Sequence, residues 1–415
     1  MKRYSEYSII RMSYKNYPAN WRIIELGDLL ERVKRPVEVI AHHKYQEIGI
    51  RSHGKGLFYK EPVKGSDLGN KSVFWIEVDC LIINIVFAWE QAVGITTTQE
   101  KGMIASHRFP MWKPKGNVEL NYLLKFFLTP FGKNLLQLVS PGGAGRNKTL
   151  GQHEFNKILV CIPSNIKEQK KIVHILTTWD KAIDLKEKFI AEKKQQKKWL
   201  IQNLLTGKKR LPGFTDRWQE VRLRDVCTIN DNVLSENTQS DFEFWYIDLS
   251  SVERGKIKHP TLAAKFNELP SRARRFFKKD DILMSTVRPY LLGFAYIDKE
   301  YDRYVCSTGF AVVRAKEDVC AKFVYYTLFS EGVIHQMNQC LIGTNYPALS
   351  NNDVYQLYFK LPPLPEQNAI AEILSTADRE INLHEKQLEE LKKQKKALMQ
   401  LLLTGMVRVN VEKVN

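Results

Sequence analysis

Apolar residues recur at alternating steps near three and four in two long segments, for roughly five heptads in each. The first series is Ile172, Leu176, Trp179, Ile183, Ile190, Leu200 and Leu204, and the second is Ile370, Leu374, Ala377, Ile381, Leu388, Leu391, Leu398 and Leu402. Neither segment contains proline or glycine inside the series, whereas Gly207 and Gly405 follow directly after the ends. Each pattern predicts an amphipathic helix that would reach about 50 Å at 1.5 Å per residue.

The two predicted helices are copies of each other. Glu168-Gln169 at the start of the first helix recurs as Glu366-Gln367 at the start of the second. From there to the ends of the helices, matching residues remain 198 positions apart. The opening motif is also repeated, because Trp21 and Trp218 are 197 residues apart. The repeat therefore includes an opening motif, a body of about 145 residues and a long helix. Two unrelated surface helices are the alternative, but the matched register favours pairing of the copies.

The two bodies resemble each other only loosely, although their order of predicted elements is the same. Each has a β-rich middle (72–83 and 281–287), a helical stretch (120–139 and 319–339), a glycine-containing loop and a short strand that leads into the long helix (158–163 and 355–361). The fold class is therefore α+β, with two globular α/β domains separated by two long helices in a pseudo-twofold internal duplication. The predicted boundaries are a loosely attached tail at 1–17, domains at 18–165 and 211–364, and helices at 166–210 and 365–410.

The net charge of the chain predicts the kind of partner that it binds. The 415 residues contain 63 Lys and Arg against 46 Asp and Glu, a net charge of +17, which favours a polyanionic partner. A basic surface that serves solubility alone is the alternative. The six cysteines are scattered in apolar contexts without a C-x-x-C pair, as buried free thiols are. The first residues form no apolar signal segment, and the longest apolar run, around 81–89, is too short to span a bilayer. We therefore expect a cytoplasmic protein with no membrane partner.

The sequence carries no recognisable catalytic or metal-binding motif. Gly207-Lys208-Lys209 is a helix end followed by a basic linker, and the glycine-rich loop at 142–145 follows a helix where a dinucleotide site needs a strand. His42, His43 and His53 have no Glu-x-x-His partner. The sequence therefore predicts binding without catalytic residues, metal or cofactor. A DNA-modifying enzyme with an unrecognised active site remains the alternative.

Candidate DNA-binding residues fall in several clusters of cations, hydroxyls and aromatic rings. In 271–279, five cations are interleaved with two aromatic rings, which suits a phosphate-clamping surface, although a solvated face would look alike. In 285–290 an arginine that could read guanine follows a predicted strand. The candidates are Trp89, Ser106, His107, Arg108, Arg146, Asn147 and Lys148 in the first body, and Arg272, Arg274, Arg275, Thr286, Arg288, Tyr290, Thr344, Asn345 and Tyr346 in the second.

These features together resemble the specificity (S) subunit of type I restriction–modification systems, the HsdS type, over nearly the whole chain from Trp21 to about Arg408. The resemblance is carried by four repeated or family-typical stretches. They are the proline-led Glu-Gln lead-ins (163–169 and 362–367), the Leu-Leu-Thr-Gly endings (204–207 and 402–405), the Leu-Pro-Gly-Phe restart (211–218) and the Asp-Ile-Leu-x-Ser-x-Val-Arg-Pro stretch (281–289). The first body lacks the Ser-x-Val-Arg-Pro stretch, so its contacts are the less defined.

The resemblance implies a non-catalytic DNA-recognition subunit. Two target-recognition domains would each read one half of a bipartite, asymmetric site in double-stranded DNA, and the long helices would pair as an antiparallel coiled coil that fixes the spacing. Two methyltransferase (M) subunits would dock on the chain, restriction (R) subunits would join them, and S-adenosylmethionine, ATP and Mg would be bound by those partners alone. A coiled-coil nucleic-acid-binding scaffold without sequence specificity is the alternative. Lys186, Lys193 and Lys197 occupy core-type positions of the first helix, which predicts a polar middle with apolar packing at the ends.

Overall fold

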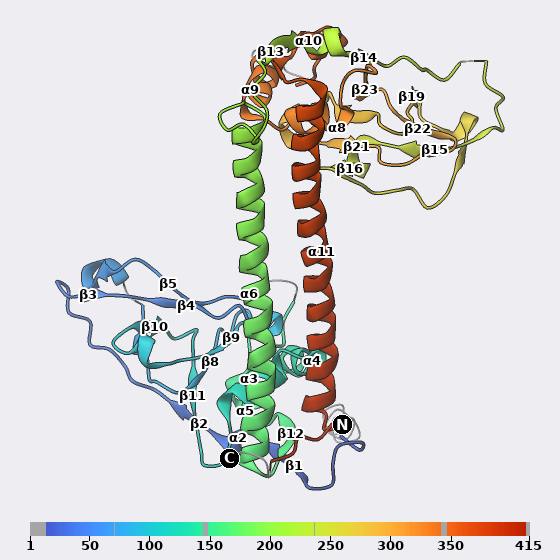
Figure 1. The fold of residues 1–415 in the computed structure, drawn as a ribbon. Helices are drawn as coiled ribbons and strands as arrows, with labels where there is room; N and C mark the ends of the chain where they lie inside the picture. The colour runs from blue at the N-terminus through green and yellow to red at the C-terminus, as the bar shows by residue number, and fades with distance from the viewer. Residues whose placement is uncertain (1–13, 70, 144–147, 236, 342–346, 412–415) are drawn as a thin grey trace. The chain divides into compact units, whose positions relative to one another are not determined.

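The computed structural model describes residues 14–69, 71–143, 148–235, 237–341 and 347–411, which divide into two compact units (Figure 1). The first unit contains Met1–Leu185 and Leu388–Asn415, and the second contains Lys186–Gln387. Each unit therefore holds one globular domain together with a part of both long helices.

The first repeat is a mixed α/β body followed by a long helix. Its elements are β1 (Trp21–Glu25), α2 (Leu26–Leu29), β2 (Leu30–Val33), β3 (Lys44–Tyr45), β4 (Ile48–Ile50), β5 (Leu57–Tyr59), β6 (Val63–Lys64), η1 (Gly65–Leu68), β7 (Val73–Trp75), β8 (Leu81–Ile83), η2 (Ala88–Glu90), β9 (Val93–Ile95), η3 (Thr98–Glu100), β10 (Ile104–Ser106), β11 (Met111–Pro114), α3 (Leu120–Phe127), α4 (Pro130–Leu138), α5 (Gln152–Asn156), β12 (Leu159–Pro163) and α6 (Ile166–Leu204).

The second repeat has the same plan. Its elements are β13 (Gln219–Arg222), α7 (Leu223–Val226), β14 (Cys227–Ile229), β15 (Glu243–Ile247), η5 (Leu249–Ser251), β16 (Val252–Glu253), β17 (Lys256–Ile257), β18 (Ala264–Lys265), η6 (Phe266–Glu268), β19 (Ala273–Phe276), β20 (Ile282–Ser285), η7 (Pro289–Leu291), β21 (Phe294–Tyr296), β22 (Tyr304–Ser307), β23 (Phe310–Ala315), α8 (Ala321–Thr327), α9 (Glu331–Cys340), α10 (Asn351–Gln356), β24 (Tyr358–Leu361) and α11 (Leu364–Leu403).

A four-stranded antiparallel sheet forms the centre of each domain, in the order β2-β11-β8-β9 in the first and β14-β23-β20-β21 in the second. The strand registers match as well, because Ile82 pairs with Met111 as Leu283 pairs with Val312. Residues of β8, β9 and β11 therefore correspond to residues 201 positions later. Their side chains differ, which is why the sequence showed the two bodies to be only loosely related.

A second shared feature is a strand pair that joins the start of each body to the start of its long helix. Strand β1 pairs antiparallel with β12, and β13 pairs antiparallel with β24. In the turn that follows each pair, Gln169 Nε2 donates to Pro163 O and Gln367 Nε2 donates to Pro362 O, both at 2.8 Å. These buried amides fix the direction in which each helix leaves its domain.

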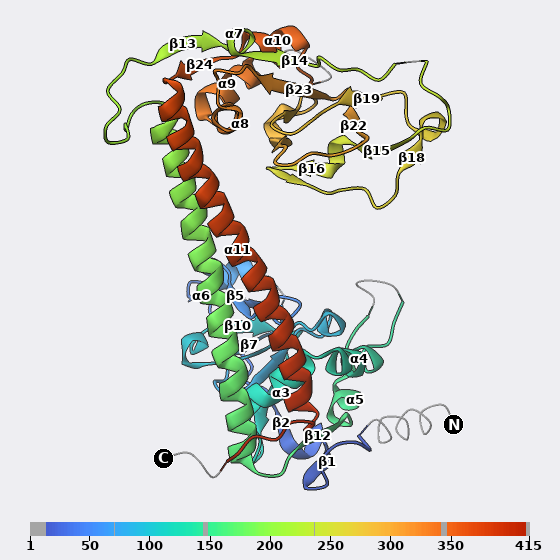
Figure 2. The ribbon, with the colours of Figure 1, turned by 45° about the vertical axis from the view of Figure 1, so that its right-hand side comes forward.

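Each domain core is completed by the end of the helix that belongs to the other repeat. Leu402 and Leu403 of α11 are 2% exposed and pack in the core of the first domain with Ile172 and Leu176 of α6. In the second domain, Leu204 and Leu205 join the core that contains Ile370 and Leu374. Within each unit the two helix segments lie side by side (Figure 2).

The helices are antiparallel in both units, as their ion pairs show. In the first unit Asp180 pairs with Lys395 of α11. In the second, Lys193 Nζ lies 2.7 Å from Glu380 and Lys197 Nζ lies 2.5 Å from Asp378. Because the later residue of α6 always meets the earlier residue of α11, the chain directions oppose each other. The antiparallel coiled coil is confirmed.

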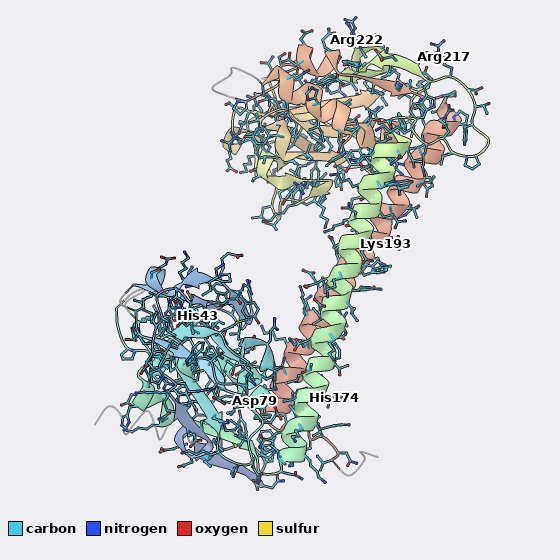
Figure 3. All side chains as sticks on the ribbon, turned by 90° about the vertical axis from the view of Figure 1, so that its left-hand side faces the viewer. His43, Asp79, His174, Lys193, Arg217 and Arg222 are labelled. Atoms are coloured by element: carbon cyan, nitrogen blue, oxygen red, sulfur yellow. The ribbon has the colours of Figure 1, made fainter. Side chains whose placement is uncertain are left out.

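The middle of the helices is polar, and several ion pairs cross between the helices there. Between the two apolar ends only Ile190 and Ile381 are buried side chains. Lys186 Nζ lies 2.9 Å from His384 Nδ1, and Lys193, labelled in Figure 3, pairs with an acid of α11. The predicted polar middle is therefore present, and ion pairs hold the helices together there in place of a dry seam.

Two kinds of predicted element differ from the structure, namely the helical stretches and the strand at 355–361. The single helical stretches after the β-rich middles are each two helices, because Thr129 and Ser330 cap new helix starts through their side-chain oxygens. Tyr355 belongs to helix α10 and not to the strand predicted at 355–361. Tyr14, which lies in the segment predicted to be a tail, is 3% exposed in the first core, and its hydroxyl donates to Leu159 O at 2.9 Å.

Candidate nucleic-acid interface

Three segments of the first domain meet just after strand β8, and main-chain hydrogen bonds hold them there. The N–H of Ile85 donates to Arg108 O at 3.0 Å, which joins the β8–η2 turn to the turn between β10 and β11. The N–H of Leu150 donates to Ile85 O at 2.9 Å, which adds the end of the glycine-rich loop. The candidate residues Trp89, Arg108 and Lys148 lie on these three segments.

The second domain repeats this junction after strand β20. The N–H of Thr286 donates to Gly309 O at 2.8 Å, and the N–H of Leu349 donates to Thr286 O at 2.9 Å. A further bond from Thr308 N–H to Arg272 O at 2.8 Å brings the start of β19 to the same place. Since these bonds involve only the main chain, the junction does not depend on the side chains that it presents. We call these two junctions the strand-end sites.

The strand-end site of the first domain presents an aromatic ring and cations. Lys148 Nζ lies 5.0 Å from the centroid of the Trp89 ring, and Trp89 Nε1 donates to Val86 O at 3.0 Å. His107 and Arg108 are exposed, and Ser106 is half-buried. The structure thus brings together five candidates of this domain, whereas Arg146 and Asn147 lie outside the described residues.

In the second domain Arg288 and Tyr290 are the exposed candidates of the turn after β20. Arg288 has a left-handed backbone with φ 49°, and its N–H donates to Pro347 O at 2.8 Å. Tyr290 is 49% exposed on the short helix η7, at the position that Trp89 has on η2. Thr344, Asn345 and Tyr346 lie outside the described residues.

Other candidates of the second domain are engaged inside the protein. Thr286 is 6% exposed and its hydroxyl donates to Gly309 O at 2.9 Å. The Arg275 guanidinium donates to Phe310 O, and burial lowers its pKa. Arg274 is half-buried over the Phe266 ring, 5.1 Å from its centroid. Of the three arginines on this segment, Arg272 is the exposed one.

The sequence motifs shared by both helices have a structural role that the sequence did not reveal. The buried carboxylate of Glu168 receives two hydrogen bonds from Arg408 at 2.8 and 2.9 Å, and Glu366 receives two from Arg210 at 2.7 Å. The Glu168 carboxylate accordingly raises the pKa of Arg408. These bidentate pairs, which we call the clasps, fasten the end of each helix to the domain of the other repeat. The separation of 198 between Arg210 and Arg408 was the signal that could have shown them.

The residues described here contain no candidate metal site. No group of three or more His, Cys, Asp and Glu in the described ranges could hold a metal ion. Four of the six cysteines are buried, whereas Cys320 is half-buried and Cys340 is exposed, unlike the buried thiols that the sequence predicts. Burial raises the pKa of Cys80, Cys161, Cys227 and Cys306 to about 12, so these thiols stay protonated near neutral pH. Within the same ranges, none of the helices combines the length and apolar character needed to cross a membrane.

Comparison with known proteins agrees with this architecture. A family model described as the type I restriction modification DNA specificity domain matches the chain twice, at residues 18–195 and 215–393. The MjaVIII specificity subunit of Methanocaldococcus jannaschii, a type I restriction enzyme subunit, is 24% identical over 99% of this chain and 98% of its own length. A putative MjaX specificity subunit from the same organism is 24% identical over 98% of each chain.

Solved structures show the same fold at low sequence identity. The HsdS subunit from Thermoanaerobacter tengcongensis superposes with a TM-score of 0.53 at 16% identity, covering 95% of this chain and all of that one. A type I S subunit from M. genitalium gives 0.56 at 13% identity, with 94% of this chain and 96% of that one covered. Specificity subunits are the DNA-recognition component of type I restriction–modification systems and not the catalytic one. Both repeats match the family model, and the chain belongs to the type I restriction–modification DNA specificity subunits.

Proposed function

We propose that this chain reads a bipartite, asymmetric site in double-stranded DNA, with one half-site for each strand-end site. The observation that carries the proposal is that both domains build the same main-chain junction and place different side chains on it. Trp89 stands where the second domain has Tyr290, and Arg108 stands where it has Gly309. Equivalent frames with different side chains suit two readers of different sequence.

The chemistry of each site supports base and phosphate contacts. A guanidinium such as that of Arg288 can bond guanine O6 and N7 together, and an exposed ring can pack on a thymine methyl. Lys148, held over the Trp89 ring, is suited to a phosphate oxygen. Each helix contains 39 or 40 residues and so rises about 60 Å. That rise equals about seventeen base pairs, and we propose that the helices fix the spacing of the half-sites.

We further propose that the duplicated helices dock two methyltransferase subunits, which are joined by restriction subunits. Leu185 and Leu383 support this, because they are equivalent positions of the repeat and are 66% and 55% exposed. Exposed leucines at equivalent places suit two copies of one partner. S-adenosylmethionine, ATP and Mg belong to those partners in this proposal.

Methylome sequencing of cells that contain the chain and its partner subunits tests the proposal. The wild type should give one split motif with two different halves. Arg108→Ala should relax a base in one half alone, and Arg288→Ala a base in the other half alone. Lys101→Ala, at an exposed lysine before β10 that belongs to neither strand-end site, should leave the motif unchanged. A motif that stays the same in both arginine variants would refute the assignment of the readers.

A nucleic-acid-binding scaffold without sequence specificity gives a different result. Both arginine variants would then weaken binding to every duplex equally, in proportion to the charge removed. The net charge of +17 is the observation that favours this second function.

A further inference from the structure

The second domain has a basic cavity of about 490 Å³ at the opposite end of β20 from its strand-end site. The turn before β20, the end of β23 and the start of α8 form its walls. Five of its lining side chains are cationic, and these are Lys278, Lys279, Arg314, Lys316 and Lys322. The cavity is in the size range of small-ligand sites.

The two carboxylates of the cavity, those of Asp280 and Asp281, already accept hydrogen bonds from other groups of the protein. Asp281 is fully buried and receives two hydrogen bonds from Arg314, both at 2.8 Å, as well as one from Lys278 N–H at 2.8 Å. Asp280 accepts a hydrogen bond from the Tyr296 hydroxyl. Arg314 is therefore neutralised by Asp281, and its pKa is raised by these hydrogen bonds.

None of the cavity's lysines forms an ion pair with a described residue, although Glu372 is near enough to Lys322 to interact with it electrostatically. Lys316 Nζ donates to the main-chain oxygen of Asp225, and Lys322 Nζ lies over the Tyr296 ring, 5.5 Å from its centroid. Among the described residues, no carboxylate oxygen lies within 4.0 Å of the ammonium groups of Lys278, Lys279 or Lys322. Several ammonium groups around one cavity repel each other, so an anion bound between them would lower the electrostatic free energy of the folded protein.

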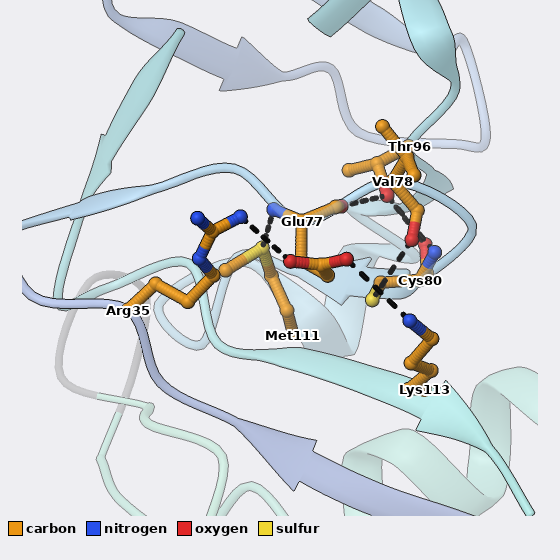
Figure 4. A network of polar contacts seen from close by, with 7 residues as sticks. All are labelled: Arg35, Glu77, Val78, Cys80, Thr96, Met111 and Lys113. Carbon is orange, nitrogen blue, oxygen red and sulfur yellow. Dashed lines mark hydrogen bonds and ion pairs between the residues drawn. The ribbon is translucent and has the colours of Figure 1, made fainter. Parts of the chain in front are cut away.

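The same place in the first domain is less basic, so the fold itself does not require this excess of positive charge. Lys316 N–H bonds Val226 O as Lys115 N–H bonds Leu29 O, which fixes the correspondence of the two domains here. Lys278 then corresponds to Glu77, which bonds Arg35 at 2.8 Å and pairs with Lys113 at 3.4 Å (Figure 4).

Two further positions extend this difference between the domains. Lys322 corresponds to Asn121, and Cys320 corresponds to Glu119, because the N–H groups of Cys320 and Glu119 both donate to the glutamine at the start of a long helix. The first domain therefore has Glu77, Asn121 and Glu119 where the second has Lys278, Lys322 and Cys320, whereas Lys115 and Lys316 are lysines in both.

We propose that this cavity binds phosphate groups, at the scale of a di- or triphosphate. Lysine ammonium groups bind phosphate oxygens as point charges, and four lysines line this one cavity. The phosphates can come from a free polyphosphate or from a DNA backbone segment away from the bases being read. In the first case the site is independent of the proposed function, and in the second it rests on it.

Calorimetric titration of the full-length chain with tripolyphosphate tests the free-ligand source. The Lys279→Glu/Lys322→Glu variant should bind at least tenfold more weakly than the wild type, because it replaces two attractive charges by repulsive ones. Lys279→Arg/Lys322→Arg should stay within about threefold, since it keeps both charges. The control Lys258→Glu/Lys360→Glu has the same charge change at two exposed lysines of the second unit that do not line the cavity, and should bind as the wild type does.

Salt-dependent binding of duplex DNA tests the other source. If backbone phosphates fill the cavity, the Glu variant should lose affinity equally for all sequences and show a shallower salt dependence, with the preferred sequence unchanged. The proposal is overturned if the cavity variant matches the control variant with both ligands. A wild-type chain that binds tripolyphosphate but no DNA would refute the proposed function and leave this site standing. Unchanged thermal midpoints in the variants would exclude misfolding as the cause of lost binding.

Discussion

The end of helix α11 is part of the first domain, and replacing Leu402 by alanine should show this. Leu402 is 2% exposed and packs in the core that also contains Ile172 and Leu176. Removing a fully buried leucine side chain costs about 2–5 kcal/mol, from lost transfer energy and the cavity left behind. A loss of that size raises the population of the opened state roughly 30-fold to several thousand-fold.

Native-state hydrogen exchange of the full-length chain, read by mass spectrometry, measures this effect for each domain separately. Peptides that contain β1 and β12 should exchange faster in Leu402→Ala, whereas peptides of β20 and β23 should be unchanged. Leu383→Ala is the matched control, because it makes the same change on the same helix at a side chain that is 55% exposed. It should alter stability by less than about 0.5 kcal/mol.

Leu204→Ala provides the reciprocal test, since Leu204 is 5% exposed and packs in the core of the second domain. It should accelerate exchange in β20 and β23 and spare β1 and β12. If Leu402→Ala behaves like the Leu383→Ala control, or if it loosens the second domain as much as the first, then the end of α11 does not complete the first core. The reasoning from burial would then be refuted.

Three further predictions concern recognition, pH and assembly. Arg288→Ala should weaken binding by roughly 1–3 kcal/mol and relax one base position, measured on a set of base-substituted duplexes with the partner subunits present; an unchanged preference would contradict it. Burial raises the pKa of Asp180, but hydrogen bonds from Lys125 and Lys395 outweigh this effect and lower the pKa overall. The contribution of Asp180 to folding stability is therefore fully present above the ordinary Asp pKa of about 3.9, and it is lost as the pH falls through the lower pKa of the folded state. Asp180→Asn should therefore reduce stability to urea at pH 7 and flatten the loss below about pH 4, and parallel wild-type and variant curves would contradict this. Residues 1–210 alone should form a homodimer that reads a palindromic site, because the core of the first domain needs a helix end that a second copy can supply; a monomer in light scattering would count against it.

The long helices, the duplication and their pairing could be predicted from the sequence because they rest on local and periodic signals. A heptad seam needs only the spacing of apolar residues, and a repeat with a constant separation of 198 is visible without any structure. The equivalence of the two four-stranded sheets could not be predicted in this way. Their strands are three to six residues long and share hydrogen-bond register without sharing side chains. Register of that kind is set by tertiary pairing.

The exposure of the candidate residues could be predicted from the sequence only in part. Arg288 and Tyr290 are exposed after β20, where the sequence predicts them. Thr286, on the same segment, turns inward because its hydroxyl finds Gly309 O, which is 23 residues away in the chain. Arg275 likewise donates to Phe310 O across the neighbouring strand. Such partners are distant in sequence, so residue type alone cannot separate an inward hydroxyl or guanidinium from an outward one.

The residues that the two repeats share are those that fasten the helices to the domains, whereas the residues that differ lie at the strand-end sites proposed to contact DNA. The clasps of Glu168 with Arg408 and of Glu366 with Arg210 are the same in both units because each must satisfy a buried carboxylate. The strand-end sites share only main-chain bonds, so a change at Trp89 or Arg288 leaves those bonds in place. Substitutions there should cost little folding stability while they change the chemistry offered to a base. If each domain reads its own half-site as proposed, a scaffold with this division should be able to acquire a new target in one domain without disturbing the other, because no clasp residue lies in either strand-end site.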